Sequence, residues 1–175
     1  MADEIEKLYA QIEDIETAMM VTRRADGHLR SRAMATQRRA PGADLWFVTI
    51  EGAAKIADLE HDSHVNLSYY NSRSREWVSV SGLAAISRDR ATIRELYAPD
   101  WKMWFPDSGD PRDGTPDDPR MVLIGVTVHA AEFLEINKPT PVLLFELAKG
   151  WVTGTEPDLG EMRSVGRAAR PESST

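Results

Sequence analysis

The sequence has 175 residues, with 28 acidic and 21 basic side chains and a formal net charge of -7. This length fits one domain, and an acidic chain is a poor match for nucleic-acid phosphates, so we expect no nucleic-acid partner. Cysteine is absent, which excludes disulfides, thiolate nucleophiles and cysteine-based metal sites and fits a cytoplasmic location. We expect no membrane association, because the acidic N-terminus lacks a signal-like apolar segment and no apolar run approaches the roughly 20 residues of a membrane span.

The spacing of apolar residues predicts a helix over residues 3–16, followed by a chain made mostly of strands. Period-two alternation between turn signals predicts six strands, over residues 18–22, 29–38, 45–49, 64–70, 77–87 and 121–136. Further helices are predicted over residues 52–60, 89–97 and 140–149. Strands joined mainly by hairpins favour a closed antiparallel barrel, so the fold class is mainly β (α+β) with flanking helices.

The domain is expected to span residues 1–153. Residues 154–175 are polar and contain Gly, Pro and Ser, which predicts a loosely ordered or disordered tail. The Pro-, Asp- and Gly-rich loop between Pro99 and Pro119 also carries Trp101, Trp104 and Phe105. We expect these aromatic side chains to pack, either into the core, against an oligomer partner or as a lid over a ligand.

Two arginines and a lysine form the main functional pattern. Arg30, Arg32 and Met34 share one face of a predicted strand, and two neighbouring arginines repel each other unless an anion or a carboxylate lies between them. The next helix opens near Gly52 and exposes free N–H groups, while Lys55 adds a cation where the helix dipole disfavours one. We interpret this pattern as a phosphate cradle, with solvated surface charges as the alternative.

Neighbouring strands offer groups to a flat ring. The strand end Phe47-Val48-Thr49 can supply backbone N–H and C=O groups, and Ser79, Ser81 and Gly82 can add hydroxyl and backbone contacts. The alternative for the serines is that they face solvent. A phosphate cradle beside such a strand suggests a mononucleotide such as a flavin, with haem or a deazaflavin as other possible occupants.

The histidines give weaker signals. His61 and His64 lack a third ligand, and His129 on an apolar strand is expected to be a structural side chain, so we predict no metal site. The sequence contains no nucleophile elbow, Walker loop or dinucleotide fingerprint, and no catalytic residue is assigned.

The order of these segments resembles the general stress protein branch of the pyridoxamine 5'-phosphate oxidase-like flavoproteins. The resemblance covers about residues 5–150 and rests on order and spacing rather than on one specific motif. The segments that carry it are Met19-Met20-Val21-Thr22, Arg30-Ser31-Arg32-Ala33-Met34-Ala35, Leu45-Trp46-Phe47-Val48-Thr49, Lys55-Ile56-Ala57-Asp58-Leu59, Val65-Asn66-Leu67-Ser68-Tyr69, Trp77-Val78-Ser79-Val80-Ser81-Gly82 and Trp104-Phe105-Pro106.

The resemblance implies a six-stranded antiparallel split β-barrel that forms a homodimer, with FMN (or FAD) bound at the interface. Many relatives have a serine where Ala54 stands, so this chain lacks one hydroxyl donor to the phosphate. The cofactor contacts that it implies are Arg30, Ser31, Arg32, Met34, Phe47, Val48, Thr49, Ala54, Lys55, Trp104 and, from the partner subunit, Ser79, Ser81 and Gly82.

The implied function is an FMN-binding general stress protein. It would be a flavin-dependent oxidoreductase with a small-molecule redox partner or, alternatively, a non-catalytic flavin carrier or sensor. The residues with which the true oxidase grips pyridoxal phosphate are not recognisable here, so we do not predict vitamin B6 oxidation.

Overall fold

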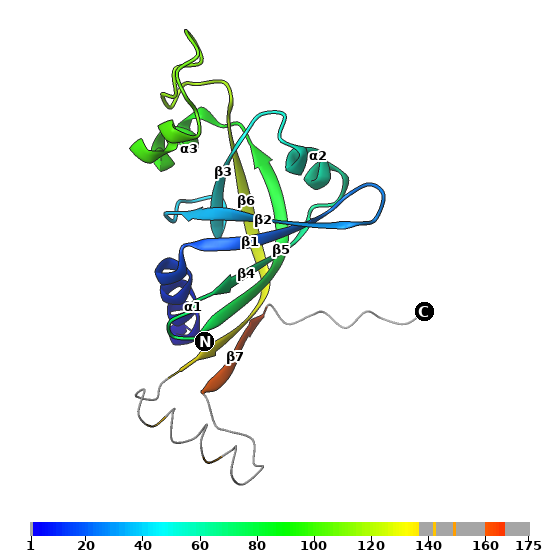
Figure 1. The fold of residues 1–175 in the computed structure, drawn as a ribbon, viewed down its shortest axis with the longest axis vertical. Helices are drawn as coiled ribbons and strands as arrows, with labels where there is room; N and C mark the ends of the chain where they lie inside the picture. The colour runs from blue at the N-terminus through cyan, green and yellow to red at the C-terminus, as the bar shows by residue number, and fades with distance from the viewer. Residues whose placement is uncertain (1, 137–141, 143–148, 150–159, 167–175) are drawn as a thin grey trace.

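The structure is a computed structural model that describes residues 2–136, 142, 149 and 160–166 (Figure 1). Within these residues seven antiparallel strands form one sheet in the order β3-β2-β1-β4-β5-β6-β7, and pairing of β3 with β6 closes the first six into a barrel. The predicted six-stranded antiparallel barrel with flanking helices is therefore confirmed. The strands are β1 (Thr17–Arg23), β2 (Leu29–Gln37), β3 (Leu45–Ile50), β4 (His64–Tyr70), β5 (Trp77–Ser87), β6 (Met121–Glu135) and β7 (Glu161–Gly166).

Three α-helices and one 3-10 helix flank the barrel in the described residues. They are α1 (Ala2–Ile15), α2 (Ala54–His61), α3 (Arg90–Leu96) and η1 (Pro99–Met103). Helix α1 packs against β4, β5 and β7, α2 against β1 and β5, and α3 against β6. Helix α2 connects β3 to β4 and lies beside the upper part of the barrel (Figure 1). Lys55 in its first turn reaches Thr49 near the end of β3.

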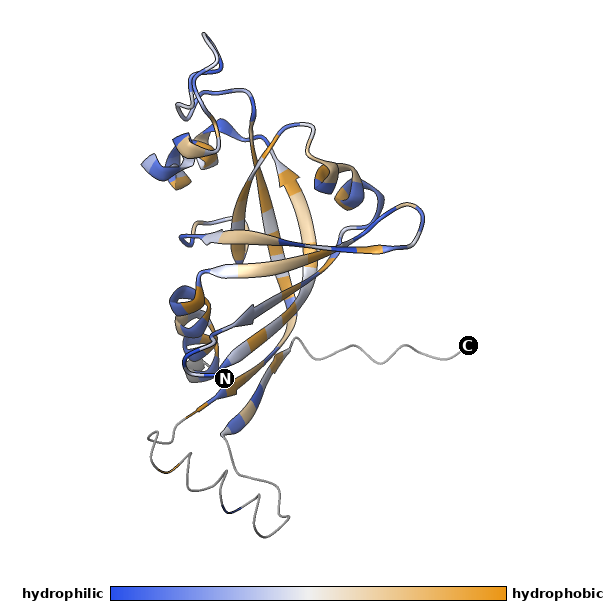
Figure 2. Ribbon diagram, in the orientation of Figure 1, coloured by the Kyte–Doolittle hydropathy of each residue, from blue (hydrophilic) through white to orange (hydrophobic). Residues whose placement is uncertain are grey.

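The barrel interior is apolar because the strands alternate as the sequence predicts. In β4, for example, Val65, Leu67 and Tyr69 are buried while the residues between them face outward. Leu8 and Ile12 of α1 pack against this core. Apolar residues accordingly concentrate along the barrel strands, whereas the turns are mostly polar (Figure 2).

A second apolar cluster lies between the outside of the barrel and the segment from α3 to η1. Trp101 and Phe105 are each only 2% exposed and pack there with Trp46 and Leu96. This confirms that the aromatic loop packs on the core. Trp104 does not join this cluster and remains 70% exposed.

A β-bulge interrupts the pairing of β5 with β6. The register shifts between Ser81 and Gly82, which leaves His129 as the additional residue of β6. A Cβ at Gly82 would overlap the carbonyl oxygen of Thr127, so only glycine fits this close backbone approach. The prediction that His129 is a structural side chain is wrong, because the residue is exposed at the bulge.

The C-terminal part contains a strand that was not predicted. Residues 161–166, which were expected to lie in a loosely ordered tail, form β7 and pair with β6 from Ala130 to Glu135. The predicted helix over residues 140–149 and the domain boundary at 153 lie almost entirely outside the described residues. None of the helices in the described part of the chain is long and apolar enough to cross a bilayer.

Candidate functional site

The arginines of β2 converge on a carboxylate from α2. Asp58 is only 7% exposed, and its Oδ2 atom accepts a hydrogen bond from Arg32 Nη2 at 3.1 Å. Arg30 Nη1 lies 4.0 Å from the same oxygen. Two neighbouring arginines require an anion or a carboxylate between them, and within this chain Asp58 supplies the carboxylate. The arginine pair alone therefore does not require an external anion.

Lys55, unlike the two arginines, has no carboxylate partner among the described residues. Its Nζ atom donates a hydrogen bond to Thr49 Oγ1 at 3.0 Å, and it forms no ion pair with a carboxylate of the described residues. Burial lowers the pKa of Lys55 from its ordinary value, and the nearby positive charge of Arg32 lowers it further. Both effects disfavour the ammonium form, and a bound anion would relieve both.

The start of α2 adds unpaired backbone donors to this cation. Ala53 is the N-cap residue, and no side chain caps the helix there. The first turn contains no acidic residue, so nothing within it offsets the positive end of the helix dipole. Lys55 and the uncapped N–H groups therefore form a locally positive region. We call Lys55, these N–H groups, Arg32 and Thr49 together the anion cradle.

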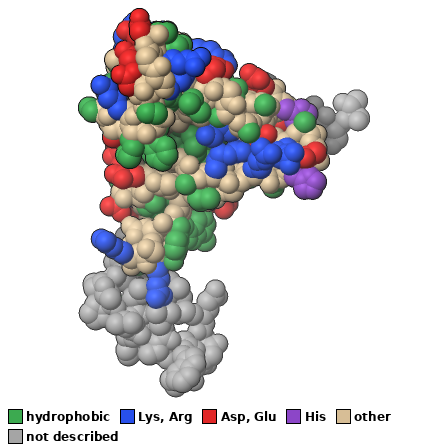
Figure 3. Space-filling view, turned by 45° about the horizontal axis from the view of Figure 1, so that its top comes forward, with side chains coloured by type: hydrophobic (Ala, Val, Ile, Leu, Met, Phe, Trp, Pro, Cys, Tyr) green, Lys and Arg blue, Asp and Glu red, His purple; other side chains and the backbone are tan. Residues whose placement is uncertain are grey.

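A cavity of about 260 Å³ opens beside the anion cradle, and we call it the Lys55 cavity. Its walls combine two strand edges with the exposed end of the aromatic loop. Lys55 and Thr49 provide polar groups on an otherwise apolar wall. The lining residues are Ala33, Met34, Ala35, Val48, Thr49, Ile50, Lys55, Trp104 and Phe105. Figure 3 shows a stripe of Lys and Arg side chains that runs across one face of the molecule towards the histidines, with apolar side chains beside it.

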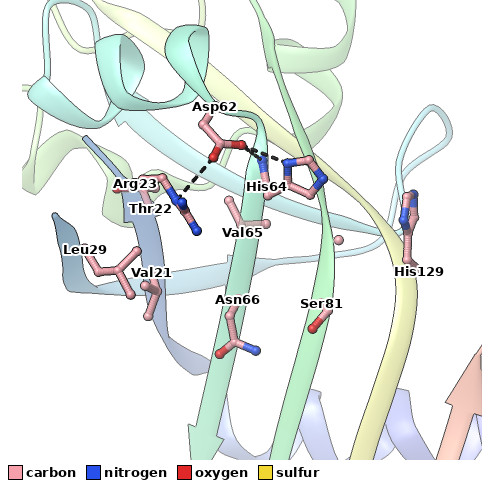
Figure 4. Close-up of a pocket in the computed structure, with 11 residues that line it drawn as sticks. Val21, Thr22, Arg23, Leu29, Asp62, His64, Val65, Asn66, Ser81 and His129 are labelled. Carbon is pink, nitrogen blue, oxygen red and sulfur yellow. Dashed lines mark hydrogen bonds and ion pairs between the residues drawn. The ribbon is translucent and has the colours of Figure 1, made fainter. Parts of the chain in front are cut away.

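A separate hollow of about 310 Å³ lies over β1, β4, β5 and β6, and we call it the His64 hollow (Figure 4). Asp62 connects two side chains at its upper rim. The Asp62 carboxylate lies 2.8 Å from His64 Nδ1 and 3.4 Å from Arg23 Nε. The backbone N–H of His64, and then its ring, lower the pKa of Asp62. Ser81 and Gly82 line the same hollow.

The structure divides the predicted site residues among different places. Met34, Val48, Thr49, Lys55 and Trp104 line the Lys55 cavity, and Arg32 adjoins it through Lys55. Ser81 and Gly82 line the His64 hollow instead, so one chain does not bring all the predicted contacts together.

The remaining predicted residues have their own environments. Ser31 is exposed on the opposite face of β2 from the arginines, and Ala54 is exposed at the start of α2. Phe47 is fully buried in the barrel core, which leaves only its backbone for a ligand. Ser79 lines neither the cavity nor the hollow, and its Oγ accepts a hydrogen bond from Asn66 Nδ2 at 3.0 Å.

Asp58 and Thr22 are polar residues of the site that were not predicted from the sequence. Thr22 is 1% exposed, and its hydroxyl connects Arg32 to Asp58. One signal was available, since Asp58 follows Lys55 by three residues and therefore lies on the same side of the helix. The position of Thr22 is harder to predict, because alternation marks it only as an inward residue of β1.

A metal site finds no support in the described residues. They contain no group of three or more His, Asp or Glu side chains arranged to hold an ion. The chemistry that the structure offers is the binding of an anion at the cradle and of a flat apolar group along the strand edges.

A closed antiparallel barrel of six strands flanked by helices has the split-barrel architecture. The chain belongs to the pyridoxamine 5'-phosphate oxidase-like family, whose model, described as pyridoxamine 5'-phosphate oxidase like, matches residues 3–158. This confirms the resemblance drawn from the sequence.

Particular relatives agree with this assignment. The chain is 38% identical over 151 residues to protein bli-3 of Neurospora crassa, covering 85% of this chain and 72% of the relative. A crystal structure from Jannaschia sp. CCS1, assigned to general stress protein 26, is 25% identical with a TM-score of 0.70 and covers 95% of this chain and all of its own. A general stress FMN/FAD binding protein from Xanthomonas citri shares the fold at 23% identity, with a TM-score of 0.63 over 80% of this chain and 93% of its own.

Proposed function

We propose that this protein binds flavin mononucleotide, with the phosphate at the anion cradle and the isoalloxazine ring against the Lys55 cavity. Lys55 and Arg32 would hold the phosphate by charge-assisted hydrogen bonds. The ring would lie along Met34 and the Val48–Thr49 end of β3, with Trp104 beside it. FAD offers the same ring with a diphosphate and is the alternative cofactor, and the Xanthomonas citri relative is described as binding FMN or FAD.

The observation that carries this proposal is the uncompensated charge of Lys55. Burial of a cation without an ion pair costs free energy, which the protein could have avoided with a carboxylate in the first turn of α2. A bound phosphate monoester would supply the missing negative charge. An apolar strand edge beside the phosphate site is what a flavin requires and a free phosphate does not.

We further propose that a second copy of this chain completes the site in a homodimer. The Lys55 cavity, at about 260 Å³, falls below the roughly 300–1,000 Å³ of pockets that enclose a ligand of this size. The partner would supply the walls that one chain lacks, including Ser81 and Gly82 from its His64 hollow. The large apolar side chains exposed outside the barrel suit such an interface, and they include Met19, Leu29, Ile50, Tyr70, Met103 and Trp104.

Titration with FMN tests the proposed function. Purified protein stripped of small molecules is expected to quench the fluorescence of added FMN and to saturate at one flavin per chain. The same titration with FAD ranks the two cofactors. Protein that is colourless as purified and leaves FMN fluorescence unchanged would contradict the proposal.

Light scattering of the purified protein tests the homodimer. We expect twice the mass of the chain, and we expect Tyr70→Lys, which places a charge on the exposed face of β4, to lower that mass and weaken FMN binding together. Tyr70 is 62% exposed in the single chain, so this change should leave the barrel folded. A wild-type protein with the mass of one chain that still binds FMN would exclude the shared site.

Bound flavin would supply the redox chemistry, and the protein would supply position and electrostatics. Consumption of reduced nicotinamide above the rate with free FMN would identify an oxidoreductase of a small substrate. Tight FMN binding without such turnover would identify a carrier or sensor.

A further inference from the structure

Asp58 closes a ring of three hydrogen bonds behind the anion cradle. Arg32 Nη1 donates to Thr22 Oγ1 at 2.8 Å, Thr22 Oγ1 donates to Asp58 Oδ2 at 3.0 Å, and Arg32 Nη2 donates to the same oxygen at 3.1 Å. Thr22 and Asp58 are almost completely buried, whereas the side chain of Arg32 keeps 21% of its surface exposed. The two buried residues therefore bind the guanidinium on its protein-facing side and leave its other side accessible.

The ring uses only part of the hydrogen-bonding capacity of Arg32. A guanidinium has five N–H groups, and the ring uses one on each Nη atom. The remaining donors share the fixed plane of the group, so the orientation of two bonds sets the orientation of all five. The positive charge of Arg32 lowers the pKa of Lys55, so the guanidinium lies near the lysine of the anion cradle.

Two roles for Asp58 make opposite predictions about a bound phosphate. As a competing counterion it would repel the phosphate and occupy the arginine that the phosphate needs. As a positioning group it would immobilise Arg32 before the ligand arrives, so that binding loses less side-chain entropy. The ring geometry favours the second role, because Asp58 shares Arg32 with Thr22 and the other donors of Arg32 have no partner among the described residues.

We propose that Asp58, acting with Thr22, is the positioning residue of the phosphate site and holds Arg32 in the orientation that receives the ligand. This inference rests on the proposed function. Coulomb's law alone predicts that removing a carboxylate near a phosphate tightens binding. Positioning predicts the reverse, so the direction of the effect distinguishes the two roles.

Binding titrations with Asp58→Asn and Thr22→Val test the proposal. Both variants keep the side-chain volume. Thr22→Val removes the hydroxyl from the ring, and Asp58→Asn replaces its charged acceptor by a neutral amide oxygen. Each is expected to weaken FMN binding about tenfold, the loss of one well-oriented charge-assisted hydrogen bond. Riboflavin, which lacks the phosphate, should bind within about twofold of wild type, since its contacts do not involve Arg32. Thr22→Ser restores the hydroxyl and is the matched control, expected to bind FMN as the wild type does.

A second measurement needs no flavin. In the ligand-free protein, the Nε–H group of Arg32 should be rigid by NMR relaxation in the wild type and in Thr22→Ser. In Asp58→Asn and Thr22→Val it should become as mobile as that of the exposed Arg73. If one of the two variants fails to fold, the relaxation of Arg32 in the other variant still tests the proposal.

The outcomes separate the two proposals. Asp58→Asn that binds FMN more tightly than wild type would overturn the inference and make Asp58 a competing counterion. Equal rigidity of Arg32 in wild type and variants would overturn it as well. A wild-type protein that binds neither FMN nor riboflavin would instead refute the proposed function, while the relaxation data would still decide whether Asp58 positions Arg32.

Discussion

Replacing Arg32 and Lys55 together by alanine is expected to weaken FMN binding by roughly a hundredfold or more, because each charge-assisted contact to an anion contributes about 1.5–3 kcal/mol. Riboflavin lacks the phosphate and should be affected far less. Lys55 lines the Lys55 cavity and has no ion pair in the described residues, and Arg32 lies close enough to Lys55 for its charge to lower the pKa of the lysine. The measurement is the ratio of the dissociation constants for FMN and riboflavin, obtained by fluorescence titration.

The control removes the same charge from a distant surface. Arg73 and Arg94 are exposed, and their double replacement by alanine should leave the ratio unchanged. Salt should also reduce the preference for FMN in the wild type more than in the Arg32 and Lys55 variant, because screening acts on the phosphate contacts. Equal losses for FMN and riboflavin would show that the two cations do not bind the phosphate.

The strands of the barrel were predictable because their signals are local. Strand β4, for example, can be predicted from its own residues, because Val65, Leu67 and Tyr69 alternate with residues that face outward. Closure of the barrel carries no such signal, since it pairs residues 45–50 with residues 121–126, far apart in the chain. It was inferred only from the number of strands and the problem of exposed edges.

The anion cradle was predictable in part for the same reason. The shared face of Arg30 and Arg32 follows from strand geometry, and the first-turn position of Lys55 follows from the predicted helix. The burial of Asp58 depends on how α2 packs against β1, which is a long-range contact. Without it, the arginine pair looked as uncompensated as Lys55, although only the lysine lacks a carboxylate partner among the described residues.

Strand β7 and the β-bulge were missed because neither has a distinctive local pattern. Glu161–Gly166 is mostly polar and forms a strand through its pairing with the exposed edge of β6. Gly82 was predicted to contact a ligand, but the structure gives another reason for a glycine there. The carbonyl oxygen of Thr127 approaches too closely to leave room for a Cβ atom. A glycine in a strand more often indicates such an approach than a ligand.

The second large effect concerns the loop that carries Trp104 to the Lys55 cavity. Asp118 is completely buried, and its carboxylate accepts hydrogen bonds from the backbone N–H groups of Gly114 and Arg120, each at 2.9 Å. The Arg120 side chain pairs with Asp118 and also donates to the carbonyl oxygen of Pro106 at 2.9 Å. This buried ion pair therefore ties both ends of the loop together.

We expect Asp118→Asn to destabilise the protein by about 3–5 kcal/mol at pH 7, the usual cost of removing one partner from a buried ion pair. Asp117→Asn is the matched control. Asp117 is the adjacent carboxylate, but it pairs with Arg94 at the surface, so its loss should cost less than about 1 kcal/mol. Urea denaturation of the three proteins measures both effects.

The dependence on pH provides a stricter test of the same ion pair. The hydrogen bonds from the Arg120 side chain, opposed in part by burial, lower the pKa of Asp118 from 3.8 to about 2. A carboxyl group whose pKa is lower in the folded state stabilises the protein above its unfolded pKa and loses that contribution as the pH falls through the folded pKa. The stability difference between wild type and Asp118→Asn should therefore be constant above about pH 4 and shrink towards pH 2. A difference that stays constant down to pH 2, or an effect no larger than that of Asp117→Asn, would mean that the loop and Trp104 are held by the packing of Trp101 and Phe105 rather than by this pair.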